Sequence, residues 1–279
     1  MSKALYRRLT VFDIVCLVIF FALVIITLFP LFFMLITSFK TPEEINQVPI
    51  TLYPHEVYMG NYSKIFHDEY FLRYFLNSVI ASVIITVVSV IGSALAGYVF
   101  AKFKFPLKSV FFYAILATIM VPFESFIVPL YNFVRSVGGV NTYFGLVFPS
   151  IISSFGIFFM KQNMEQIPDA LVEAAKIDGA GNWHILRTII MPLSGSSLSV
   201  LSILLFITAW SDYLWPLVIA TSKDMFVLEI GLTLLQDEYF IDYGQMMAGC
   251  AVALIPAMIL FIFFRRYIME GIAMSGIKG

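Results

Sequence analysis

Six long stretches of the chain are apolar and almost free of charge, and this pattern predicts a membrane protein built from helices. Glu124 interrupts the third stretch and Asp212 interrupts the fifth. A helix needs about 20 apolar residues to cross the hydrocarbon core of a bilayer. We therefore predict an all-α integral membrane protein with six transmembrane helices, near residues 12–36, 74–101, 109–133, 143–162, 193–219 and 244–264.

The first apolar stretch follows Arg7 and Arg8, which is also the pattern of a secretory signal. It is much longer than the roughly 7–15 apolar residues of a signal peptide, and no small-x-small cleavage pattern closes it before Pro30. We therefore expect this helix to be retained, after a cytoplasmic N-terminus of residues 1–10. Residues 11–279 then form a single transmembrane domain.

The composition of the 279 residues agrees with a lipid environment, because 60% are hydrophobic and only 13% are charged. Soluble domains carry about 45–50% apolar and about 25% charged residues. This argues against a soluble enzyme and a disordered regulator. The 17 basic residues against 18 acidic ones leave no basic excess for binding nucleic acid.

The orientation in the membrane follows from the lysines and arginines, which concentrate in cytoplasmic segments of membrane proteins. If the N-terminus is cytoplasmic, 12 of the 17 lie inside: Lys3, Arg7, Arg8, Lys102, Lys104, Lys108, Lys161, Lys176, Arg187, Arg265, Arg266 and Lys278. The outer segments hold Lys40, Lys64, Arg73, Arg135 and Lys223. We therefore predict that both termini are cytoplasmic.

Two external loops, residues 37–73 and 220–243, separate the predicted spans on the outer side. The run Thr41-Pro42-Glu43-Glu44 has a cap, a first-turn proline and acidic residues, which are typical of a helix start. Residues 61–66 fit another short helical turn. These loops are either a contact surface for an external partner or solvated connections.

The long loop 165–192 between the fourth and fifth spans is too polar to cross a membrane. Pro168 and Asp169 suit the first turn of a helix, and Gly179 suits its end. We expect Asn182 to cap a second short helix. Such a helix–glycine–helix unit is either a docking element, in which Glu173 pairs with a partner arginine, or a structural re-entry loop.

The sequence of this loop resembles the EAA loop of bacterial ABC importer permeases. The matching residues are Glu173-Ala174-Ala175, Gly179, Ile189 and Met191-Pro192, with Met191 where the family usually has leucine. Lys176-Ile177-Asp178-Gly179-Ala180 resembles the carbohydrate-uptake branch. Asn77-Ser78, the run 209–217, the glycine-rich tail 271–279 and the six-helix layout resemble the smaller, G-type permease of the maltose importer. The resemblance covers about residues 8–279.

This resemblance implies a permease subunit of an ATP-driven, binding-protein-dependent sugar importer in the bacterial cell (inner, or plasma) membrane. It implies as partners a second permease in a heterodimer, two ATPase subunits, an extracytoplasmic solute-binding protein that contacts the 220–242 loop, and a sugar or oligosaccharide substrate. It assigns ATPase coupling to Glu173, Ala174, Ala175, Asp178, Gly179 and Ala180. The chain has no G-x-x-x-x-G-K-[ST] loop. We therefore expect no cofactor, metal or catalytic residue here, and ATP and Mg on the partner ATPases.

Ionisable and aromatic residues within the spans are candidates for the translocation path, because a charge facing lipid is costly. We expect Glu124, Asn132, Trp210, Asp212 and Tyr213 to line it, since aromatic faces and carboxylates suit a sugar. The alternatives are an interfacial aromatic belt for the tryptophans and a packed, neutral carboxyl for Glu124. Ser93 and Gly97 have the small-xxx-small spacing that permits close helix packing.

Two other classes of membrane protein fit the sequence less well than a permease. A secondary carrier or channel subunit fits the composition, but would more often carry several buried charges and would not need the 165–192 loop. An intramembrane protease would need a histidine at membrane depth, whereas His55, His67 and His184 all map outside the spans. Co-purification of an ATPase bound through the loop would favour the importer.

Overall fold

The computed structural model describes the backbone of residues 10–235 and 242–275, and the side chains of 10–235 and 242–266. All regular elements in these residues are helical. Three helices are long and apolar enough to span a membrane: α1 (Val11–Thr37), α4 (Phe71–Lys102) and α15 (Tyr243–Ser275). Three bent helix pairs bring the number of candidate spans to as many as six.

The first two bent pairs coincide with predicted spans, whereas the third, over residues 182–210, begins inside the predicted loop 165–192. A proline lies at or near each break. The first pair joins α5 (Lys108–Ile119) to the turn η1 (Phe123–Phe126) and α6 (Ile127–Ser136) at 99°. Pro122 immediately precedes η1, and its missing N–H and fixed φ disfavour a continuous helix. The stretch 109–133 is therefore not the single straight helix that its apolar pattern suggests.

The other two breaks also lie close to prolines, Pro149 and Pro192. The helix α7 (Tyr143–Val147) and the turn η2 (Phe148–Ser150), which contains Pro149, meet α8 (Ser154–Glu165) at 47°. The segment Asn182–Leu193 meets α12 (Gly195–Trp210) at 78°. This segment comprises α10 (Asn182–Ile185), the π-helical turn η3 (Leu186–Ile190) and α11 (Met191–Leu193).

The remaining short elements fill the loops. They are α2 (Pro42–Ile45), α3 (Gly60–His67), α9 (Asp169–Ile177), α13 (Leu214–Ile219), η4 (Lys223–Met225) and α14 (Leu228–Leu234). The predicted helix start at Thr41 is confirmed, because its side chain accepts a hydrogen bond from the N–H of Glu44 at 3.3 Å. The short helix predicted at 61–66 is confirmed as α3.

The chain divides into two compact units, and we describe each by itself. The first comprises Met1–Asp68 and Leu234–Val252. Its loop after α1 is held by buried polar side chains: Lys40 donates to the carbonyl of Thr51, and Asn61 donates to the carbonyls of Ser38 and Lys40 at 2.9 Å each. This internal bonding makes the loop an ordered structure rather than a loose connection.

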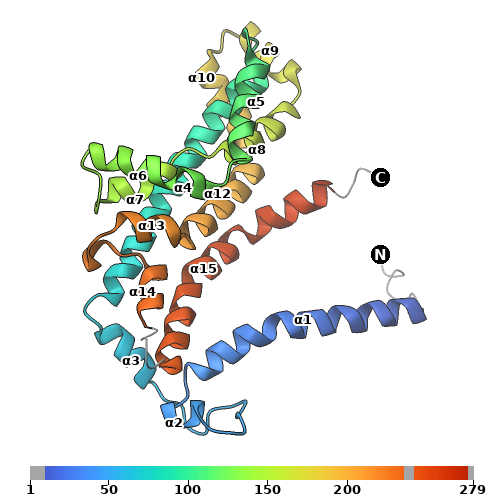
Figure 1. Cartoon of the computed structure of the whole chain (residues 1–279). Helices are drawn as coiled ribbons and strands as arrows, with labels where there is room; N and C mark the ends of the chain where they lie inside the picture. The colour runs from blue at the N-terminus through green and yellow to red at the C-terminus, as the bar shows by residue number, and fades with distance from the viewer. Residues whose placement is uncertain (1–9, 236–241, 276–279) are drawn as a thin grey trace. The chain divides into compact units, whose positions relative to one another are not determined.

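The second unit comprises Glu69–Thr233 and Ala253–Gly279, and α4 is packed against α8 and α12 within it (Figure 1). The close approach of α4 and α8 requires small residues. A Cβ on Gly97 would lie 2.7 Å from the Cβ of Met160, and a Cβ on Gly156 would lie 2.2 Å from the hydroxyl of Ser93. The predicted packing role of Ser93 and Gly97 is confirmed.

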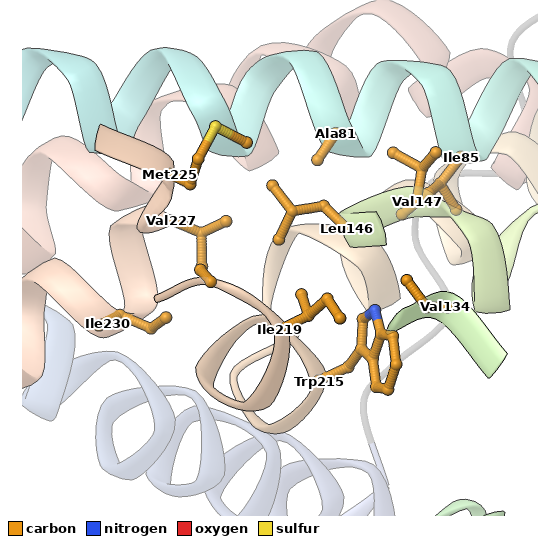
Figure 2. Close-up of a cluster of buried hydrophobic side chains, with 11 residues drawn as sticks. Ala81, Ile85, Val134, Leu146, Val147, Trp215, Ile219, Met225, Val227 and Ile230 are labelled. Atoms are coloured by element: carbon orange, nitrogen blue, oxygen red, sulfur yellow. The ribbon is translucent and has the colours of Figure 1, made fainter. Parts of the chain in front are cut away.

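One buried cluster joins four separate parts of this second unit (Figure 2). Its largest member is the fully buried Trp215 on α13, whose indole N–H donates to the carbonyl of Gly145 at 2.8 Å. The cluster consists of Ala81, Ile85, Val134, Leu146, Val147, Trp215, Ile219, Ala220, Met225, Val227 and Ile230. Because α4, α6, α7 and the 214–230 segment share it, this cluster keeps the broken helices in place.

Candidate functional site

The loop 165–192 folds into two short helices joined at Gly179, as the sequence predicts. α9 ends in a Schellman turn: the N–H of Gly179 bonds to the carbonyl of Lys176 at 3.0 Å, and the N–H of Ala180 bonds to that of Ala175 at 2.9 Å. The φ of Gly179 is +83°, a region that favours glycine. Asn182 is the first residue of α10 rather than its cap, which is Gly181.

The two sides of α9 differ in chemistry. Val172 is buried in a cluster with residues of α4, α8 and α12. On the other side, Glu173, Ala174, Asp178 and Gly179 are exposed, whereas Ala175 and Ala180 are partly buried against the cluster. The predicted coupling residues therefore divide into an outer group that a partner can reach and an inner pair that seats the helix.

A groove of about 490 Å³ runs beside this turn. Its lining comprises Ala175, Asp178, Gly179, Ala180, Gly181, His184, Thr188 and Ile189. Two large apolar side chains of the loop are exposed, Ile177 (86%) and Trp183 (67%). Exposed apolar side chains beside a groove with few large side chains are typical of a protein-binding surface. Glu173 takes part in none of the ion pairs formed by the residues that the structure describes.

The start of α9 is bonded to the end of α4. The ammonium of Lys102 donates to the carbonyl of Ile167 at 2.5 Å and to the carboxylate of Asp169 at 2.6 Å. The hydrogen bond and the charge of Lys102 lower the pKa of Asp169. Since Asp169 is also in the first turn of α9, its charge suits the helix dipole.

A second candidate site is a cavity of about 470 Å³ between the broken helices of the second unit. Asp212 and the hydroxyl side chains of Ser150, Ser153, Thr208 and Ser211 line it, beside Ile85, Phe123, Pro149, Ile152, Leu205 and Ala209. Asp212 lies in the break between α12 and α13 and lines the cavity.

The other residues predicted for the path lie outside this cavity. Glu124 is exposed on η1, although its neighbour Phe123 lines the cavity, and Asn132 is exposed on α6. Tyr213 is 38% exposed. Trp210 is buried, stacks on Phe206 at 5.8 Å between ring centroids, and donates its N–H to the carbonyl of Ala253 at 3.1 Å. In this structure its ring packs inside the chain.

Both tryptophans that were considered for an aromatic belt, Trp210 and Trp215, are buried and bonded to backbone carbonyls. They are therefore part of the interior packing of this chain.

The segment after α13 is held against α4. Asn77 of α4 donates to the carbonyls of Asp224 and Phe226 at 2.8 and 2.9 Å and accepts from the hydroxyl of Tyr143 at 2.6 Å. Arg73 donates to the same carbonyl of Asp224 at 2.9 Å. The predicted external loop 220–243 is thus anchored in its first part, and residues 236–241 lie outside the described part of the chain.

Sequence reasoning missed several residues of these sites. The hydroxyl groups of the cavity gave no signal, because serine and threonine are common in packed membrane helices. Lys102 was read only as a cytoplasmic charge. Asn77 and Ser78 were noted for their resemblance to relatives, but their bonds to residues about 150 positions away along the chain are visible only in the fold.

Comparison with known proteins adds independent information. Residues 90–273 match the family described as "Binding-protein-dependent transport system inner membrane component". The arabinooligosaccharides transport system permease protein AraQ of Halalkalibacterium halodurans is 36% identical over 257 residues, 91% of this chain and 92% of that protein. The sn-glycerol-3-phosphate transport system permease protein UgpE of Brucella abortus is 30% identical over 258 residues, 89% of this chain and 92% of that protein.

A solved structure shares the fold. It is described as the crystal structure of a bacterial ABC transporter involved in the import of the acidic polysaccharide alginate. One of its chains superposes with a TM-score of 0.84 and 22% sequence identity, covering 95% of this chain and 99% of that chain. The helical arrangement described above is therefore also found in a transporter subunit.

Proposed function

The chain belongs to the binding-protein-dependent transport system inner membrane components, and from this premise we propose that it imports a sugar or oligosaccharide as one half of an ATP-driven transporter. Its curated relatives are permease proteins, and this chain is likewise a permease subunit rather than an enzyme. The family works with a solute-binding protein, as its description says.

We propose a polyhydroxylated solute as the substrate. Two relatives are named for arabinooligosaccharides and sn-glycerol-3-phosphate, and both of these solutes carry at least two hydroxyl groups. The cavity that contains Asp212 supports this choice, because its four hydroxyl side chains and one carboxylate can exchange hydrogen bonds with such a solute. Small-molecule binding sites usually combine an apolar lining with a few polar groups, as this cavity does.

The proposed topology has six spans, near residues 12–36, 74–101, 109–133, 143–162, 193–219 and 244–264, and both termini in the cytoplasm. It places loop 165–192 in the cytoplasm, loops 37–73 and 220–243 outside, and one transmembrane domain over 11–279, in a multi-pass protein of the bacterial inner membrane. The distribution of lysines and arginines supports this orientation.

We propose that loop 165–192 docks on a cytoplasmic ATPase subunit. The observation that carries this proposal is the α9–Gly179–α10 turn, which presents Glu173, Ala174 and Asp178 on its outer side while Val172 seats it. ATP and Mg bind the two ATPase subunits, and a second permease completes the translocation path. Closure of the ATPases then moves the loop and rocks the helices between inward- and outward-facing states.

The test of docking is the change Glu173→Lys in the assembled complex. Breaking a hydrogen-bonded charge pair at an interface costs about 2–5 kcal/mol, so ATPase subunits should bind at least about thirtyfold more weakly. Glu43→Lys is the matched control, because Glu43 is an exposed glutamate in the short helix α2 of a proposed external loop. Equal ATPase retention by both variants would overturn the docking assignment.

The translocation path is tested separately. We propose that Asp212, with Tyr213 at the same break, lies on the path, and that Glu124 and Asn132 reach it only together with the second permease, because both are exposed in this chain. Trp210 contributes by fixing this region through its buried bond to Ala253.

Asp212→Asn and Glu124→Gln should alter the uptake kinetics of the transported solute. Ser202→Ala is the control, because the Ser202 hydroxyl bonds only within α12 and Ser202 does not line the cavity. Unchanged KM and maximal rate in both carboxylate variants would remove these residues from the path.

The segment 220–243 is proposed as the contact for the solute-binding protein. The anchoring of its first part by Asn77 and Arg73 supports this, because a fixed loop meets a partner at a lower entropic cost. Exchange of this segment for that of a relative with another substrate should abolish stimulation by the cognate binding protein. Stimulation that survives the exchange contradicts this assignment.

A further inference from the structure

The helix α4 is bonded through side chains near both of its ends, and these two sets of bonds are far apart. The helix has 32 residues, which at a rise of 1.5 Å each gives a length of about 48 Å. It contains no proline and no break between Phe71 and Lys102. The three bent pairs beside it are all interrupted. A displacement at one end of α4 is therefore carried to the other end without a hinge.

Near its start, α4 is bonded to the external segment 224–228. The buried amide of Asn77 donates to the carbonyls of Asp224 and Phe226. The hydroxyl of Ser78 accepts from the N–H of Leu228 at 2.7 Å. Every second residue of the segment, Asp224, Phe226 and Leu228, is therefore bonded to one of two adjacent residues of the helix.

At its other end, α4 is bonded to both arms of loop 165–192. Lys102 has a side chain that is only 3% exposed, and its ammonium donates to Ile167 and Asp169 just before and at the start of α9. The hydroxyl of Tyr98, one turn earlier, donates to the carbonyl of Asn182 at the start of α10. If the buried ammonium of Lys102 lost these partners, its charge would be left uncompensated, which is costly. The start of α9 is therefore firmly attached to the end of α4.

We propose that α4 is a strut that couples the external segment 224–228 to loop 165–192, with Asn77 and Lys102 as the positioning residues at its two ends. This inference rests on the proposed function, in which these two segments meet the binding protein and the ATPase. Docking of the binding protein then changes the position of loop 165–192 through α4. Because coupling is reciprocal, nucleotide on the ATPase changes the affinity for the binding protein by the same factor.

The rival explanation is that each set of bonds merely stabilises its own end of the helix. A purely local role changes the amount of assembled complex but not the ratio of binding-protein-stimulated to basal ATPase activity. That ratio, measured per assembled complex, is therefore the discriminating readout. A double-mutant cycle compares the loss of this ratio in the double variant with the losses in the two single variants, and so tests whether the two ends act together.

The experiment uses the full complex in lipid nanodiscs, with Asn77→Asp, Lys102→Met and the double variant. Asn77→Asp keeps the size of the side chain and removes both donated bonds, while Lys102→Met keeps the length and removes the charge. Tyr143→Phe is the control for the external end, because it leaves both donations of Asn77 intact. Lys104→Met is the control for the other end, because Lys104 is exposed two residues away.

Each single variant should lower the ratio by about fivefold or more, the lower end of common coupling strengths, and the controls should not. The double variant should lose no more than the larger single loss, because a strut detached at one end transmits nothing. Losses that multiply, or a ratio unchanged in both single variants, would overturn the proposal.

If either variant prevents assembly, Ser78→Ala and Tyr98→Phe, which each remove one bond of the same two ends, go through the same cycle with the same two outcomes. A wild-type complex that shows no stimulation by any solute-binding protein contradicts the proposed function instead. Failure of the strut and failure of the function are thus distinguishable.

Discussion

Gly179 offers a test of loop 165–192 in which the size of the effect follows from the backbone alone. Its φ is +83°, and a Cβ built on it would meet no atom within 4 Å. A side chain there therefore brings no clash, only the cost of the left-handed conformation, which is about 1–2 kcal/mol for an ordinary L-residue. Asparagine tolerates this region better than alanine, and valine tolerates it worse.

A cost of one or two kcal/mol changes an equilibrium by a factor of about 5–30. If the helix–turn–helix conformation must form for the ATPase to dock, ATPase binding should weaken in the order Gly179→Asn, Gly179→Ala, Gly179→Val, with the alanine variant about 5- to 30-fold weaker than wild type. Titration of purified ATPase subunits against the permease pair in nanodiscs measures this directly.

Gly181→Ala is the matched control, because Gly181 also has no atom within 4 Å of a built Cβ but has a φ of −73°. The control should bind like wild type. If the three Gly179 variants and the Gly181 variant all bind alike, the Schellman turn is irrelevant to docking and the reasoning is refuted.

Three further predictions concern stability. Gly97→Ala should lower the free energy of unfolding by about 1–3 kcal/mol through overpacking against α8, whereas Gly92→Ala, with open space around it, should not; thermal melting of both variants in detergent decides this. Trp215→Phe should cost about 1–3 kcal/mol by leaving the carbonyl of Gly145 unpaired in the core, and a melting temperature equal to that of wild type would contradict it. Burial raises the pKa of Glu229, so wild type should gain stability as the pH falls through that pKa, and Glu229→Gln should melt higher than wild type only above it.

Local signals in the sequence were sufficient for the start of α2 and the end of α9, but not for the start of α10, whose cap is Gly181 rather than the predicted Asn182. Thr41, Pro42 and Gly179 act on neighbours within a few residues, so their roles follow from backbone chemistry and were confirmed by the capping bond and by the Schellman turn. The close packing at Gly97 was also predictable, because small residues spaced by four lie on one face of a helix.

The angles of the three bent helix pairs could not be predicted from the sequence. Pro122 and Pro149 each mark a weak point, but whether a proline kinks a span slightly or turns it by 99° depends on what packs around the break. Here the cluster that contains Trp215 joins the neighbouring helices α6 and α7 to α13, which lies much later in the sequence. An apolar stretch indicates that its residues are buried, but it does not show whether lipid or other parts of the protein cover them.

The positions of the candidate residues in loop 165–192 were predictable from the sequence, whereas those of the candidate residues in the spans were much less so. Glu173 and its neighbours share a short helix, so their spacing is informative. The sequence marks Asp212 because a charge in an apolar stretch is conspicuous, and this residue lines a cavity in the structure. An indole such as that of Trp210 is equally suited to a ligand wall and to a buried core, so its type alone does not distinguish the two. Lys102 and Asp169 are 67 residues apart, and only the fold brings them together.

The central claim is that this chain is half of an importer that draws on ATP through a partner. Uptake of the solute captured by its binding protein, measured in proteoliposomes that contain the full complex, tests that claim most directly. We predict uptake that requires both the binding protein on the outer side and ATP on the side of loop 165–192. Uptake driven by an ion gradient, with neither ATP nor the binding protein present, would contradict the account and identify a secondary carrier.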